Sequence, residues 1–286
     1  MSELRESGLI RLVPHLGRRG AWFLPPWAVL CGAVASPPFH LSPGDAARLA
    51  MTILLVEGGW GTLWSALGAT DWITPLQRWR TWTGHHPTPL LPYTRAGSPA
   101  ERIASWLSRF RSWWEEAFLP SAGRALGAAL AGLLVSLLVA FTLGPEIFLL
   151  TLGVLALMEL ALLSRRGRMP PSSGWDSVVR VGGAWLAGHL AFGPLSLPSV
   201  ALAGAFSLAI AGAEGGRSHA RSMWIGGQFL AALLLVSLHR PLAASFLVLL
   251  LTPQWLLLAH PVPPNPARRY ALLWLATAML LTAWAM

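Results

Sequence analysis

Nine long apolar runs constrain the fold of this chain more than any other feature of its sequence. A helix that crosses a bilayer needs roughly 17 to 25 mostly apolar residues, because no backbone polar group can stay unpaired in hydrocarbon. The runs predict nine membrane-spanning helices, at about 21–37, 46–67, 124–143, 145–163, 178–194, 196–213, 222–238, 240–258 and 269–285. We therefore expect an all-α integral membrane protein that forms one polytopic domain over residues 1–286.

The composition excludes the soluble classes of protein. Of the 286 residues, 54% are hydrophobic and 12% are charged, with a mean hydropathy of +0.54, whereas soluble domains carry about 25% charged residues. The single cysteine, Cys31, cannot form an intramolecular disulfide, which excludes a disulfide-stabilised fold. All 21 basic residues are arginines, and the net charge is +9. Because they lie between apolar runs, we expect them to set topology and contact lipid headgroups, and we expect no nucleic-acid partner.

The arginines also predict the orientation of the helices. Short loops rich in arginine stay in the cytoplasm. With a cytoplasmic N-terminus, 19 of the 21 arginines fall in cytoplasmic segments, which leaves Arg48 and Arg240 outside. The expected location is the bacterial inner membrane. The longest loop, 68–123, is then cytoplasmic, and it is too long to be a simple connector.

The 68–123 loop contains a predicted amphipathic helix. Ser98 and Pro99 provide an N-cap and a first-turn proline. The apolar residues that follow have helical spacing and are Ile103, Trp106, Leu107, Phe110, Trp113, Trp114 and Phe118. Charged residues between them predict a helix that lies in the headgroup plane. The alternative is a helix that covers the bundle without touching lipid.

The loop after the sixth predicted span carries the most informative motif. It reads G-A-E-G-G-R-S-H-A-R-S-M-W-I-G-G over residues 212–227. Glu214, Gly215 and Arg217 match the D-x-E-G-D-R motif of the UbiA superfamily of intramembrane prenyltransferases, which the nine-span topology also resembles. The chain is thus similar to this superfamily in topology and in part of one motif.

Three further stretches bear on this resemblance. The first motif of the superfamily, N-D-x-x-D-x-x-x-D, corresponds to L-W-S-A-L-G-A-T-D at 63–71, where Asp71 remains. The stretch 89–102 is similar to the R-P-L-P-S-G-R-I-S segment that follows that motif. Residues 18–22, R-R-G-A-W, are similar to a stretch of the YwiC-like membrane proteins.

The resemblance implies a ring of nine helices whose cytoplasmic mouth is covered by the 68–123 loop, and a site for a prenyl diphosphate with Mg²⁺. On that analogy Asp71 and Glu214 would ligate the metal. The candidate phosphate or headgroup ligands are Arg78, Arg80, Arg217 and Arg221.

Most acidic positions of the two motifs are missing, however. In their place the chain has Trp64, Leu67, Gly212 and Gly216, which cannot ligate Mg²⁺. We therefore expect a non-catalytic subunit of a membrane complex that binds a prenyl or other long-chain lipid, or acts as a scaffold for other membrane-protein subunits. The alternative is an active prenyltransferase with a reduced metal site at Asp71 and Glu214.

Several polar residues inside the predicted spans have two interpretations each. His189 has small neighbours and is a candidate axial ligand of a haem or pigment, which would make the chain a pigment-binding or assembly subunit; the alternative is a packed histidine bonded to a carbonyl group. Glu57 is either functional or a protonated acid bonded to a neighbouring helix. Gln228 and Gln254 are expected to form hydrogen bonds between helices.

Overall fold

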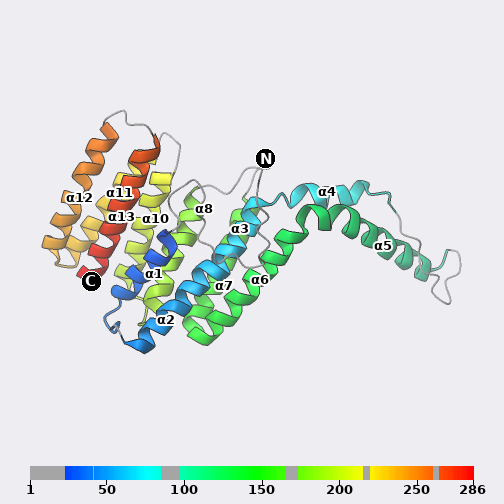
Figure 1. Ribbon diagram of the computed structural model, residues 1–286, viewed down its shortest axis with the longest axis horizontal. Helices are drawn as coiled ribbons and strands as arrows, with labels where there is room; N and C mark the ends of the chain where they lie inside the picture. The colour runs from blue at the N-terminus through cyan, green and yellow to red at the C-terminus, as the bar shows by residue number, and fades with distance from the viewer. Residues whose placement is uncertain (1–22, 41, 85–96, 165–172, 215–219, 260–263) are drawn as a thin grey trace.

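A computed structural model describes residues 23–40, 42–84, 97–164, 173–214, 220–259 and 264–286 (Figure 1). Of the residues that the structure describes, 87% lie in helices and none lies in a strand. Most helices stand side by side in one bundle, and α4 and α5 extend from it as an arm.

The helices coincide with the apolar runs of the sequence. In chain order the elements are α1 (Leu24–Val34), α2 (Pro43–Ile53), the π-helical segment η1 (Leu54–Gly61), α3 (Thr62–Ala69), α4 (Ile73–Thr81), α5 (Pro99–Trp113), the π-helical segment η2 (Trp114–Phe118), α6 (Leu119–Leu143), α7 (Pro145–Leu163), α8 (Ser173–Ser177), the π-helical segment η3 (Val178–Gly183), α9 (Ala184–Leu190), α10 (Leu197–Glu214), α11 (Ala220–Ser237), α12 (Pro241–Ala259) and α13 (Pro264–Ala285). The trios α2–η1–α3, α5–η2–α6 and α8–η3–α9 each run without a break as one long helix.

Within the described residues, four helices are long and apolar enough to cross a membrane. They are Pro99–Leu143, Pro145–Leu163, Leu197–Glu214 and Ala220–Ser237. Three shorter apolar helices are Leu24–Val34, Pro241–Trp255 and Leu272–Ala285. The coarse prediction of a helical chain with membrane-spanning segments is thus supported, and every one of the nine predicted spans overlaps a helix.

Local sequence signals explain several helix ends. Ser98 accepts a hydrogen bond from the backbone N–H of Glu101 at 3.2 Å, which confirms the predicted N-cap of α5. Gly144 has φ +125°, a conformation that favours glycine, and ends α6. Pro145 then begins α7 directly.

The predicted 68–123 loop differs from expectation in one respect. The helix Pro99–Leu143 has 45 residues and runs from this loop through the third predicted span without a break. Leu119 and Pro120 follow the π-helical segment η2 directly, and the helical backbone continues through them. The sequence had suggested a separate amphipathic helix in this loop. The loop helix and the third span are therefore one element.

The order of packing follows the order of the chain. Each long helix packs against the next one, and α13 returns to pack against α1. In addition α1 packs closely along α9, across the middle of the arrangement. A side chain at Gly188 would collide with the backbone of Val29, so glycine is required for this contact. The middle of the bundle is thus closed by helix contact.

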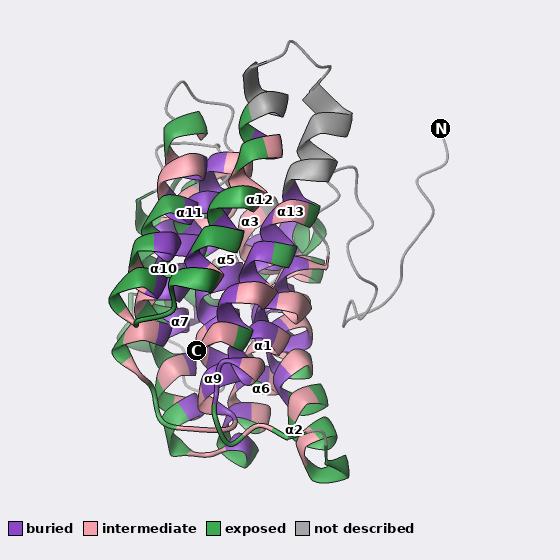
Figure 2. Ribbon diagram, turned by 90° about the vertical axis from the view of Figure 1, so that its left-hand side faces the viewer, coloured by how far each residue is buried: buried purple, intermediate pink, exposed green. Residues whose placement is uncertain are grey.

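The inward faces of the bundle helices are buried (Figure 2), and several large side chains are among the buried residues. Trp60, Trp185 and Phe206 are among the most buried residues, and the rings of Trp185 and Phe206 stack at 5.8 Å. The indole N–H of Trp185 donates to Ser199 at 3.0 Å, so this buried polar group is satisfied.

The outer surface of the bundle is apolar. Along α6 one helical face is 58–77% exposed and consists of Leu130, Leu134, Leu138 and Phe141. Contiguous apolar surface of this kind is unfavourable in water and is typical of a lipid-facing helix.

Candidate functional site

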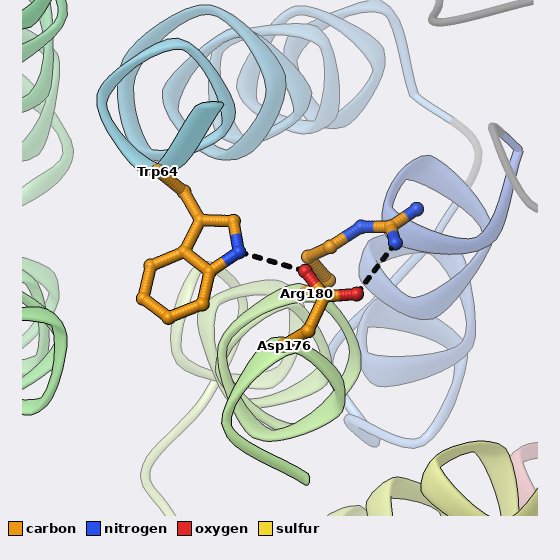
Figure 3. A network of polar contacts seen from close by, with 3 residues as sticks. All are labelled: Trp64, Asp176 and Arg180. Carbon is orange, nitrogen blue, oxygen red and sulfur yellow. Dashed lines mark hydrogen bonds and ion pairs between the residues drawn. The ribbon is translucent and has the colours of Figure 1, made fainter. Parts of the chain in front are cut away.

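A network of polar contacts joins α3 to α8 and the π-helical segment η3. Arg180 of η3 forms an ion pair with Asp176 of α8 at 2.9 Å, one helical turn away. The indole N–H of Trp64 donates to the other carboxylate oxygen of Asp176 at 2.7 Å (Figure 3). Because Trp64 is only 8% exposed, this bond links two long helices at a largely dry position.

Two further carboxylates act on the same guanidinium. Glu57 of η1 and Glu214, the last residue of α10, both interact electrostatically with Arg180. Three segments that are far apart in the sequence thus bring carboxylates to one arginine. In the predicted topology Trp64, Asp176 and Glu214 lie at cytoplasmic ends of spans, and Glu57 lies deeper. We call Glu57, Trp64, Asp176, Arg180 and Glu214 the Arg180 cluster.

Both helices that supply the centre of this cluster are locally widened. Glu57 belongs to the π-helical segment η1 and Arg180 to the π-helical segment η3. Such widened turns are rare in proteins, and those that do occur are often found at functional sites. The two segments meet where Trp60 packs against Gly183, at 3.4 Å from the position of a Cβ atom. The buried Trp60 ring of η1 thus reaches the backbone of η3 at Gly183.

The predicted metal ligands have different surroundings. Glu214 lies beside Arg180, as described above. Asp71 organises the first turn of α4: its carboxylate accepts hydrogen bonds from the backbone N–H groups of Ile73 and Thr74 at 3.1 Å and from the Thr74 hydroxyl at 2.7 Å. Among the described residues, no group of three or more His, Cys, Asp or Glu side chains is placed to hold a metal ion. Arg180 is paired with Asp176 and interacts electrostatically with Glu57 and Glu214, and a guanidinium at this position disfavours a second cation such as Mg²⁺.

The predicted phosphate ligands are distributed over two regions. Arg78 and Arg80 are exposed in the last turn of α4, on the arm. Arg221 is exposed in the first turn of α11, in the bundle, and Figure 1 shows these helices well apart. Arg217 lies outside the described residues. The arginines thus offer positive charge at two places.

His189 is buried between helices. Its Nε2 atom lies 3.1 Å from the carbonyl oxygen of Pro194, and the residue is 2% exposed. The adjacent Gly188 packs against the backbone of Val29 on α1. This arrangement favours the packed histidine over the ligand of a macrocycle.

Aromatic rings hold the arm together. We define the α4–α5 arm as residues 73–81 and 99–118. Trp79 of α4 contacts Trp106, Phe110 and Trp113 of α5, with ring centroids 5.5–6.2 Å apart. Arg109 donates to the carbonyl oxygen of Trp79 at 2.9 Å and lies over its ring at 4.9 Å. The predicted amphipathic helix is present, and part of its aromatic face covers α4.

The rest of that face points outward. The exposed apolar residues of the arm are Ile73, Leu76, Ile103, Trp106, Leu107 and Phe110. Exposed arginines accompany them at positions 78, 80, 102 and 111. Apolar side chains interleaved with cationic ones are typical of a helix pair at a lipid headgroup layer.

The sequence did not lead us to predict Asp176 and Arg180 as partners. Trp64 was considered only as a residue that replaces an acidic position of the motif. The signal was present: an acidic and a basic residue four apart at the start of an apolar run predict an ion pair on one helix. No sequence rule pairs Trp64 with Asp176, because 112 residues separate them.

Comparison with known proteins gives no relative of this chain. No protein-family model matches it, and neither a curated protein nor a solved structure matches it. The similarity to the UbiA superfamily therefore rests on the motifs quoted above.

Proposed function

We propose that this chain is a non-catalytic membrane subunit that binds a prenyl or other long-chain lipid, or acts as a scaffold in a membrane complex. In this proposal all nine apolar runs cross the bacterial inner membrane in a UbiA-like ring with a cytoplasmic N-terminus. The packing of each helix against the next, and of α13 against α1, supports the ring. The 19 arginines of the predicted cytoplasmic segments support the orientation.

The Arg180 cluster is the observation that carries the non-catalytic part. Ionisation of an allylic diphosphate requires metal ions held by clustered carboxylates, since several negative charges must be neutralised. Here an arginine stands among the carboxylates, and Asp176 is already engaged by Arg180 and Trp64. The buried Trp60 ring packs against Gly183 of η3. These contacts support a structural core in place of a catalytic cavity.

The α4–α5 arm supports the lipid-binding part. Its exposed apolar side chains match the apolar layer of a membrane surface, and its exposed arginines match the anionic layer, although Arg111 is paired with Glu115. An arm that projects from the bundle also offers contact surface to another membrane subunit.

Native mass spectrometry of the full chain, extracted from membranes in mild detergent, tests this proposal. We expect retained adducts with the masses of phospholipids or polyprenyl phosphates, and no prenyl product when geranylgeranyl diphosphate, Mg²⁺ and aromatic acceptors are supplied. Product formation that is lost in the double variant Asp71→Ala/Glu214→Ala would favour an active prenyltransferase. A chain that carries no lipid would contradict lipid binding. A visible absorption band would favour the pigment-binding alternative.

A further inference from the structure

A groove of about 360 Å³ lies between α11 and α12, and none of its lining residues belongs to the Arg180 cluster. Its walls are mainly apolar and include Ile225, Val248, Leu251 and Trp255. Val248 and Trp255 are exposed on the outside of the bundle. The groove therefore opens sideways, toward the hydrocarbon if the bundle crosses the membrane.

The polar groups of the groove are already paired with one another. The amide groups of Gln228 and Gln254 exchange two hydrogen bonds, at 2.8 and 3.1 Å. The indole N–H of Trp224 donates to the Gln254 carbonyl oxygen at 3.0 Å. Both glutamines are buried. Because these groups need no further partner, a hydrocarbon chain leaves none of them unsatisfied, whereas a polar ligand would have to displace existing bonds.

A proline lies inside α12 beside the groove. Pro253 lies inside α12, next to the lining residues Thr252 and Gln254. Proline has no N–H, so it removes one backbone hydrogen bond and its ring displaces the preceding turn. A proline at this position therefore favours local space between α12 and its neighbour.

Positive charge lies at one end of the same face. Arg221 is exposed in the first turn of α11, one helical turn before Ile225 and two before Gln228. Residues four apart share a helix face. A guanidinium binds phosphate oxygens through forked hydrogen bonds. The groove and this arginine therefore match the two parts of an amphiphile.

We propose that the α11–α12 groove holds the hydrocarbon chain of a phosphate-bearing lipid, with the phosphate at Arg221. The volume lies at the lower end of the range of about 300–1,000 Å³ for ligand pockets, so it suits part of one chain better than a fused ring system. This inference rests on the proposed lipid-binding function and names the site and the ligand class for it.

Calorimetric titration of the detergent-purified full chain with farnesyl monophosphate tests the groove. Val248→Trp places an indole at a lining position of the groove, and Leu242→Trp places one on α12 at a position that is 76% exposed and outside the lining. We expect Val248→Trp to raise Kd about tenfold or more and Leu242→Trp to change it less than about twofold. Equal affinities of the two variants overturn the inference. If Val248→Trp does not elute as folded protein, Thr252→Phe at the groove rim takes its place.

A second pair of variants tests the phosphate. Arg221→Gln is compared with Arg240→Gln, at the opposite end of α11 and α12. We expect only Arg221→Gln to weaken farnesyl monophosphate, by about fivefold or more, while the affinity for farnesol stays unchanged. If inorganic phosphate alone binds with the same affinity as farnesyl monophosphate, the hydrocarbon chain of the lipid contributes nothing to binding. That result refutes the proposal.

The failure of this inference and that of the proposed function are distinguishable. If the wild-type protein retains membrane lipid in native mass spectra and yet does not bind farnesyl monophosphate, the lipid binds elsewhere, and only the inference about the groove is overturned. A chain that neither retains lipid nor binds farnesyl monophosphate overturns both.

Discussion

Replacing Trp64 with phenylalanine removes one hydrogen-bond donor from the Arg180 cluster and leaves an aromatic ring in place. The donor lies 2.7 Å from a carboxylate oxygen of Asp176. A hydrogen bond to a charged group contributes about 1.5–3 kcal/mol. Because the side chains of Arg180 and Asp176 remain 28% and 24% exposed, solvent screens part of this energy. We therefore expect Trp64→Phe to lower the free energy of unfolding by about 2 kcal/mol.

A double-mutant cycle with Asp176→Asn isolates the interaction. The asparagine keeps an acceptor oxygen but no charge, and a neutral hydrogen bond is about half as strong as a charge-assisted one. In that background Trp64→Phe should cost about 1 kcal/mol, which gives a coupling energy of about 1 kcal/mol. Reversible unfolding in mixed detergent micelles measures these values. The control Trp284→Phe, at a position 81% exposed, should change stability by less than about 0.5 kcal/mol. A coupling energy near zero would refute the reasoning.

Two further predictions concern packing and membrane contact. Gly227→Ala places a Cβ atom against the backbone of Ala205 and should destabilise the chain by about 2 kcal/mol or more in the same assay. The control Gly226→Ala, whose added Cβ has no atom within 4 Å, should stay within about 1 kcal/mol of the wild type. Equal effects of the two variants would contradict the close contact between α10 and α11. In a cysteine-free background reconstituted in vesicles with anionic lipid, a spin label at position 107 of the arm should show high collision rates with oxygen and low rates with a water-soluble nickel complex. A label at Ser105, on the other side of α5, should show the reverse, and two water-exposed labels would exclude contact of the arm with lipid.

The apolar runs predicted most of the helices, because the length and composition of a run can be read from consecutive residues. Every predicted span overlaps a helix, and the Ser98 cap lies where a serine before a proline places it. The hydrogen bonds predicted for Gln228 and Gln254 join these two side chains to each other. This success has a physical reason: a glutamine inside an apolar run has few partners other than another buried polar group.

The arrangement of the Arg180 cluster was not predictable in the same way. Trp64 and Asp176 meet only because two distant helices pack at one register, and no local rule fixes that register. The widening of the helices at η1 and η3 leaves no clear composition signal beyond paired glycines. The contact of α1 with α9 likewise depends on small residues in both helices, whose pairing only the folded chain defines.

Calorimetric titration with a non-hydrolysable analogue of geranylgeranyl diphosphate, with Mg²⁺ and after chelation, tests the central claim most directly. Among the described residues no group of three or more His, Cys, Asp or Glu side chains is placed to hold a metal ion, and Arg180 is the cation that acts on the carboxylates of the cluster. The account predicts that any binding is unchanged by chelation, because the lipid chain and arginines carry it. Tight binding that depends on Mg²⁺ and disappears on chelation would contradict the account and restore the prenyltransferase function.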